Sequence, residues 1–71
     1  MTDTKMLEAA IALSGIPKGV IAEKIGISRS TFFKKIRNEN EFKATEIAKL
    51  QEILSLTAEA RNRIFFAKEG D

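Results

Sequence analysis

The sequence predicts an all-α protein, a compact bundle of about five short helices. Apolar residues recur at spacings of three and four along almost the whole chain, and no stretch shows sustained alternation of apolar and polar side chains. Glycine and proline occur singly, at positions where these periodic stretches end. Because the chain has 71 residues, we expect one domain over residues 1–71 with one small core.

The first helix is expected from about Thr4 to Ser14, with Gly15 at its end. Its core-facing side consists of Met6, Leu7, Ala10, Ile11 and Ser14. A second helix starts near Pro17, whose missing N–H costs nothing in a first turn, and ends at Gly26. The residues on its core-facing side are Ile21, Ala22 and Ile25.

The third helix is expected from Arg29 to about Arg37. Ser28 is a suitable N-cap, because its hydroxyl can accept from the free N–H groups of the first turn. Phe32 and Ile36 lie four residues apart and form the buried stripe. This helix therefore has one side in the core and one side in solvent.

The polar residues 38–41 predict a surface loop, whose far end Phe42 holds in the core. A fourth helix follows over about residues 44–54, with an N-cap that the sequence does not reveal. Its inward residues are Ile47, Leu50, Ile53 and Leu54, and its outward residues include Lys49 and Glu52.

A fifth helix is capped by Thr57 and runs to about Ala67, with Ala60, Ile64 and Phe65 facing the body of the domain. Phe65 and Phe66 are adjacent, so one face of a helix cannot bury both. Phe66 is either at the exposed edge of the core or an isologous contact in a dimer.

Charge is distributed unevenly along the chain. Residues 16–37 hold six basic side chains against Glu23 alone, a net charge of +5, whereas the other residues carry six basic and nine acidic ones, a net charge of −3. The six basic residues are Lys18, Lys24, Arg29, Lys34, Lys35 and Arg37. Such asymmetry indicates either a face that meets a polyanion or a solvated basic face.

The segment from about residue 17 to residue 37 has the sequence pattern of a helix-turn-helix. Ala22 is small where two helices cross, and Gly26 permits the positive φ of a turn that sets the helices at about 90–120°. The corner is held by Ile21, Ile25 and Ile27. The solvent side of the third helix presents Arg29, Ser30, Phe33, Lys34 and Arg37, as a recognition helix does toward the major groove.

The stretch from Ile21 to Thr31, IAEKIGISRST, resembles the helix-turn-helix of phage repressors and Cro-like regulators, the lambda-repressor-like DNA-binding domains. Within that family, Lys35-Ile36 and Ile64-Phe65-Phe66 are similar to small phage-encoded repressor-like proteins of Gram-positive bacteria. The resemblance covers most of the chain. It implies a bundle of about five helices, operator DNA as ligand, and commonly a homodimer on a palindromic site.

By this resemblance, Arg29 and Ser30 lie where family members contact base edges, with Lys34 one turn further along. We predict that these three residues read bases, and a bidentate contact of an arginine with guanine provides about 1–3 kcal/mol of discrimination. Lys34 either reads a base or holds a phosphate. The predicted phosphate contacts are Lys18, Ser28 and Arg37.

Two further residues, Thr31 and Phe33, are candidate DNA contacts. Phe33 either touches a thymine methyl group or folds back onto residues 38–41. Lys24 and Lys35 are not expected to contact DNA. Lys24 lies on the back of the second helix, and the stem of Lys35 covers the core edge while its charge reaches water.

We therefore predict a protein that binds double-stranded DNA sequence-specifically, as a phage or prophage transcriptional repressor acting as a homodimer on a palindromic operator. The alternatives are a protein-binding module on this scaffold, such as an antirepressor or antitoxin-like adaptor, and a DNA-binding accessory protein of recombination. An enzyme is not expected, because the sequence has no His, no Cys and no glycine-rich phosphate loop. No metal, cofactor or small-molecule effector is expected.

The first residues carry Asp3 beside the single Lys5, and the apolar stretch that follows them, 9–13, is short. This pattern fits neither a signal peptide nor a membrane span. We expect a cytoplasmic protein without a membrane partner.

Overall fold

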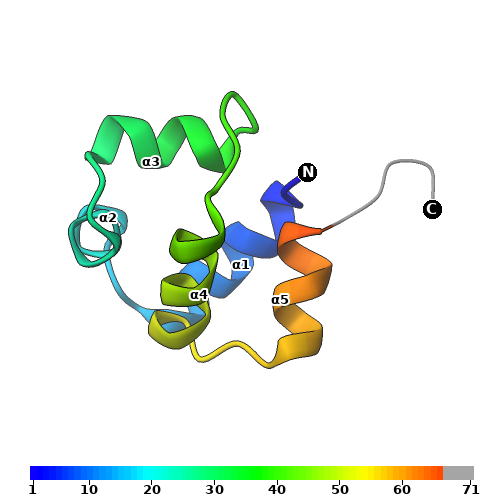
Figure 1. Cartoon of the computed structure of the whole chain (residues 1–71). Helices are drawn as coiled ribbons and strands as arrows, with labels where there is room; N and C mark the ends of the chain where they lie inside the picture. Colours follow the sequence, from blue (N-terminus) through cyan, green and yellow to red (C-terminus); the bar gives the residue numbers. More distant parts are fainter. Residues whose placement is uncertain (67–71) are drawn as a thin grey trace.

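Five α-helices joined by short connections make up the structure, a computed structural model that describes residues 1–66 (Figure 1). Their bounds are α1 Thr4–Ser14, α2 Lys18–Ile25, α3 Arg29–Ile36, α4 Ala44–Ile53 and α5 Ala58–Phe65. Residues 1–66 contain no strand, so the predicted all-α class is confirmed. Within the same range, no helix has the length and apolar character that a membrane crossing requires.

Two glycines end the first two helices as predicted. Gly15 has φ 70° and Gly26 has φ 83°, a left-handed conformation that glycine adopts without a steric penalty. The place of Pro17 in α2 differs from the prediction by one residue. Pro17 has extended backbone angles, φ −61° and ψ 144°, and is therefore the N-cap of α2 and not a residue of its first turn.

Side-chain caps begin three of the helices. The hydroxyls of Ser28 and Thr57 each accept from the backbone N–H three residues further on, both at 3.0 Å, which confirms both predicted caps. Asp3 caps α1 in the same way, at 3.1 Å, and this cap was not predicted.

The later boundaries agree with the sequence to within one residue where the structure describes them. Arg37 is the C-cap of α3 and Leu54 that of α4. The N-cap of α4 is Lys43, whose backbone N–H donates to the Glu46 carboxylate at 2.9 Å. For α5, which ends at Phe65, the expected last residue Ala67 lies outside the described residues.

The core joins all five helices. Its fully buried centre consists of Leu7, Ile21, Phe32 and Leu50. Phe42 is also buried, as predicted, and its ring packs edge-on against Phe32 and Phe65, with centroids 6.0 and 5.4 Å away. Phe42 thereby connects the chain between α3 and α4 to the core.

Met6 does not belong to the core, contrary to the sequence prediction. Its side chain is 37% exposed, whereas Leu7 and Ile11 are buried. Adjacent residues are about 100° apart around a helix, so Met6 lies well to one side of the direction in which Leu7 points. The buried stripe of α1 is therefore narrower than the apolar pattern suggested.

The N-terminal residues fix the end of α3. The Thr4 hydroxyl donates to the carbonyl of Ile36 at 2.6 Å. Asn38, with φ 63°, accepts from the backbone N–H of Thr2 at 2.9 Å and donates to its carbonyl at 2.8 Å. The last turn of α3 is thus tied to the start of the chain, and the exposed side of α3 is held at an edge of the molecule (Figure 1).

Candidate nucleic-acid interface

A tight corner connects α2 to α3. The backbone N–H of Gly26 donates to the carbonyl of Ala22, and the N–H of Ile27 donates to the same carbonyl at 3.1 Å. Ala22 is almost completely buried at this corner. In Figure 1, α2 is seen nearly along its axis while α3 runs across the view, so the two helices are steeply inclined.

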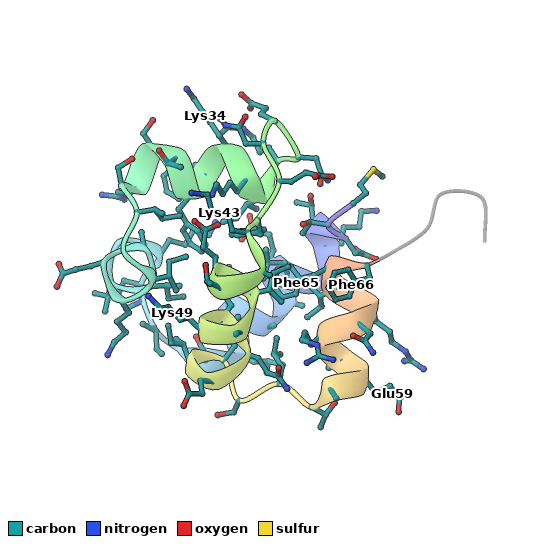
Figure 2. The ribbon with its side chains drawn as sticks, viewed as in Figure 1. Lys34, Lys43, Lys49, Glu59, Phe65 and Phe66 are labelled. Atoms are coloured by element: carbon teal, nitrogen blue, oxygen red, sulfur yellow. The ribbon has the colours of Figure 1, made fainter. Side chains whose placement is uncertain are left out.

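The helix α3 has one side in the core and one in solvent, as predicted. Phe32 and Ile36 are buried. Ser30, Lys34 and Arg37 are exposed and follow one another at helical spacings of four and three. We call these three residues the outer stripe, and Figure 2 shows Lys34 projecting from α3 away from the body of the molecule.

Arg29 does not lie on the outer stripe. It points toward the start of α2, where a Cβ atom built on Gly19 would lie 3.8 Å from the Arg29 Cδ atom. Its guanidinium carbon is 5.5 Å from the centroid of the Phe33 ring. Of the three predicted base readers, the structure thus brings Ser30 and Lys34 together and places Arg29 at the side that faces α2.

Lys18, the first residue of α2, forms an ion pair that the sequence did not reveal. Its Nζ atom lies 2.8 and 3.0 Å from the two carboxylate oxygens of Glu8 on α1. The same Nζ atom is 5.6 Å from the centroid of the Phe33 ring. Glu8 is ten residues away in the sequence, and no local pattern marks it as a partner.

Phe33 is half-buried and packs against the core. Its ring meets the cations of Lys18 and Arg29. Beside it lies an open hollow of about 260 Å³, lined by Glu8, Lys18, Phe33, Ile36 and Arg37. Phe33 therefore joins the start of α2 to the first turn of α3, and its contact with a thymine methyl group stays a prediction.

The other predicted phosphate contacts also have partners within the protein. Arg37 forms an exposed ion pair with Glu39, with 2.6 Å between Nε and a carboxylate oxygen. The Ser28 hydroxyl accepts from the backbone N–H of Thr31 and donates to its side-chain hydroxyl at 2.8 Å. Ser28 and Thr31 lie together at the N-terminus of α3.

Lys35 differs from the sequence expectation, because its charge does not reach water. The residue is 7% exposed, and its Nζ atom lies 2.6 Å from the carboxylate of Glu46, itself 6% exposed. This pair joins α3 to α4, which the sequence could not show because the partner lies eleven residues away. Lys24 is exposed in the last turn of α2.

Opposing effects act on the pKa of Glu46. Burial by itself raises the pKa, because it penalises the charged form. The hydrogen bonds from Lys35 and from the backbone N–H of Lys43, together with the two lysine charges, outweigh burial and hold the pKa below its ordinary value. The carboxylate is therefore charged whenever the pair is intact near neutral pH.

At the end of α5, Phe65 is buried and Phe66 is 56% exposed (Figure 2). As the sequence implied, only one of the adjacent rings enters the core. Phe66 borders an open hollow with Met1 and Phe42. Its role in a dimer stays a prediction.

The chain matches no protein-family model, no curated protein and no solved structure. Within residues 1–66, no group of three or more metal-ligating side chains lies close enough together to hold an ion.

Proposed function

We propose that this protein binds double-stranded DNA in a sequence-specific manner, with α3 lying in the major groove. The observation that carries the proposal is the outer stripe, Ser30, Lys34 and Arg37, on a helix whose other side is anchored in the core. The major groove admits an α-helix, and its base edges offer acceptors to side-chain donors. A rigidly held, basic and polar helix face has the properties of such a reading head.

The residues of this face divide into two groups. Ser30 and Lys34 point outward from α3 and contact base edges, and Arg29 reaches bases from the side of the helix that faces α2. Lys18 begins α2, where free N–H groups and a positive charge both favour a phosphate. Arg37, at the end of α3, contacts a phosphate further along the same groove.

Phosphate binding here involves an exchange of partners. Lys18 is paired with Glu8, and Arg37 is paired with Glu39. A DNA phosphate that approaches either cation replaces or shares the carboxylate. Each of these cations therefore neutralises less phosphate charge than an unpaired lysine or arginine would. The affinity for DNA should accordingly fall less steeply with salt concentration than the number of basic residues suggests.

As a repressor, the protein would act in two copies. Two α3 helices in successive major grooves lie about 34 Å apart, which calls for a palindromic site. A promoter that overlaps this site is blocked when the site is occupied.

The decisive experiment is selection of bound duplexes from a random pool at two salt concentrations, followed by affinity measurements on the enriched site. Arg29→Ala should lower discrimination between sites by about 1–3 kcal/mol. Lys18→Ala should weaken binding to all duplexes and reduce the salt slope by less than about one unit, because Glu8 shares the charge of Lys18. The matched control is Lys49→Ala on α4, which removes the same charge from an exposed position away from α3 (Figure 2).

The proposal fails if no duplex sequence is enriched. It also fails if Arg29→Ala and Lys18→Ala both bind duplex DNA as the Lys49→Ala control does. An enriched site without two-fold symmetry would be consistent with α3 as the helix that reads the bases. It would contradict binding by two symmetric copies of the protein.

A further inference from the structure

The Phe33 ring is shared by two cations that come from different helices. The Nζ atom of Lys18 is 5.6 Å from its centroid, and the guanidinium carbon of Arg29 is 5.5 Å from it. Both distances fall within the range of about 6 Å over which the electron-rich face of an aromatic ring attracts a positive charge.

Each cation also has a second neighbour. The Arg29 side chain lies beside Gly19, where an added Cβ atom would be 3.8 Å from the Arg29 Cδ atom, in ordinary van der Waals contact. Lys18 is held by both carboxylate oxygens of Glu8. The ring of Phe33, itself packed on the core, is the element common to the two arrangements.

We propose that Phe33 is a positioning residue for DNA recognition, which holds the Arg29 guanidinium and the Lys18 ammonium at a fixed separation before DNA arrives. This inference rests on the proposed function. Phe33 acts through the two cations, so its own contact with DNA is not required. This role makes Phe33 a determinant of sequence specificity, because the position from which Arg29 contacts a base depends on the Phe33 ring.

The physical reason is conformational entropy. Arginine and lysine have long side chains with many rotamers, and binding a base or a phosphate fixes them. A side chain that is already held near its bound position loses less freedom on binding. A leucine at position 33 would fill part of the same space against the core but offers no aromatic face, so Arg29 would lose its aromatic contact and Lys18 would keep only its pair with Glu8.

The main test compares Phe33→Leu with Phe33→Tyr on the selected duplex and on a scrambled duplex. Phe33→Leu should lower the ratio of specific to non-specific affinity by about 2- to 30-fold, the range that a cation–aromatic contact provides. Phe33→Tyr keeps the ring and should restore the ratio to within about twofold. Thermal unfolding of both variants reports any loss of packing separately.

A double-mutant cycle with Arg29 separates positioning from packing. If the ring acts through the guanidinium, Phe33→Leu should change the ratio much less in an Arg29→Ala background than in the parent. An equal effect in both backgrounds would overturn the inference while leaving DNA binding intact. Failure of the parent to prefer any duplex would instead reject the proposed function, and the inference with it.

An NMR measurement on the unaltered protein tests the same geometry if the Phe33→Leu variant does not fold. Protons that lie over an aromatic ring resonate upfield, so the Arg29 δ-methylene and the Lys18 ε-methylene should be shifted upfield in the NMR spectrum. The references in the same spectrum are the corresponding groups of the exposed residues Arg63 and Lys49. If the methylene protons of Arg29 and Lys18 had the same chemical shifts as those of Arg63 and Lys49, the two cations would not lie over the Phe33 ring.

Discussion

The buried ion pair between Lys35 and Glu46 leads to the most demanding prediction. Lys35→Met keeps most of the unbranched stem that packs between α3 and α4 and removes only the charge. Glu46 then stays 6% exposed with one hydrogen bond, from the backbone N–H of Lys43 at 2.9 Å. An unpaired carboxylate in such a place is strongly disfavoured.

The free-energy cost of removing the Lys35 charge has an upper limit, because the unpaired carboxylate of Glu46 can take up a proton. Protonation costs 1.36 kcal/mol for each pH unit above the ordinary pKa of 4.5, which is about 3.4 kcal/mol at pH 7 and about 0.7 kcal/mol at pH 5. We therefore expect Lys35→Met to lower the free energy of unfolding by about 3 kcal/mol at pH 7. The deficit should shrink to about 0.7 kcal/mol at pH 5, a decrease of about 2.3 kcal/mol.

The parent protein provides a constant reference over this range. Its Glu46 has a lowered pKa, so the stabilisation from the pair is complete above the ordinary pKa of 4.5 and is lost only as the pH falls further, through the folded-state pKa. The chain also has no histidine, so no side chain with an ordinary pKa between 5 and 7 complicates the comparison.

The assay is urea unfolding at pH 7 and pH 5, followed by the circular dichroism of the helices. At pH 7 the midpoint of thermal unfolding should fall by about 12–24 °C, since each kcal/mol corresponds to about 4–8 °C in a domain of this size. Lys34→Met is the matched control, with the same charge change on an exposed residue of α3, and should shift stability by less than about 0.5 kcal/mol. The double variant Lys35→Met with Glu46→Gln should recover most of the loss.

Two results would refute this reasoning. A deficit of equal size at pH 5 and pH 7 would mean that the stranded carboxylate is not its cause. A comparable loss in Lys34→Met would mean that the net charge of α3, and not the buried pair, determines stability.

Three further predictions concern the surface and the turns. Glu8→Gln should free Lys18 and raise duplex affinity about twofold to fivefold in an electrophoretic mobility assay at low salt, as expected from a partly exposed ion pair. Gly26→Ala, at φ 83°, should cost about 1–2 kcal/mol in urea unfolding, whereas Gly19→Ala inside α2 should stabilise by about 0.5–1 kcal/mol. In sedimentation at several concentrations, we expect the parent to associate into dimers and Phe66→Ser to stay monomeric.

Each of these predictions has a clear opposing outcome. Glu59→Gln, which breaks the exposed pair with Arg63 on α5, controls for net charge and should not change affinity to the same extent. Lower affinity of Glu8→Gln would mean that Glu8 orients Lys18 for DNA. Equal stability of the two glycine variants would remove the case for a special turn at Gly26, and equal monomeric mass would exclude Phe66 from dimerisation.

Local features of the sequence were sufficient to predict the helices. Gly15 and Gly26 end α1 and α2, and Ser28 and Thr57 cap α3 and α5, because each effect acts within one turn of the chain. The burial of Phe32 was likewise readable from its spacing to the next apolar residue. Most helix boundaries and buried faces are thus set by residues within a turn or two, although Met6 shows that the width of a buried face depends on packing.

Only the tertiary structure decided which charged side chains remain free on the candidate interface. Lys18 meets Glu8 across ten residues, and Lys35 meets Glu46 across eleven. Arg29 lies beside Phe33 rather than on the outer stripe. These pairings depend on how whole helices pack against one another, and helix periodicity carries no information about that packing. The sequence alone therefore determined the helix α3 with its buried and exposed sides, while the packing of α1, α2 and α4 around it determined which charged side chains are paired.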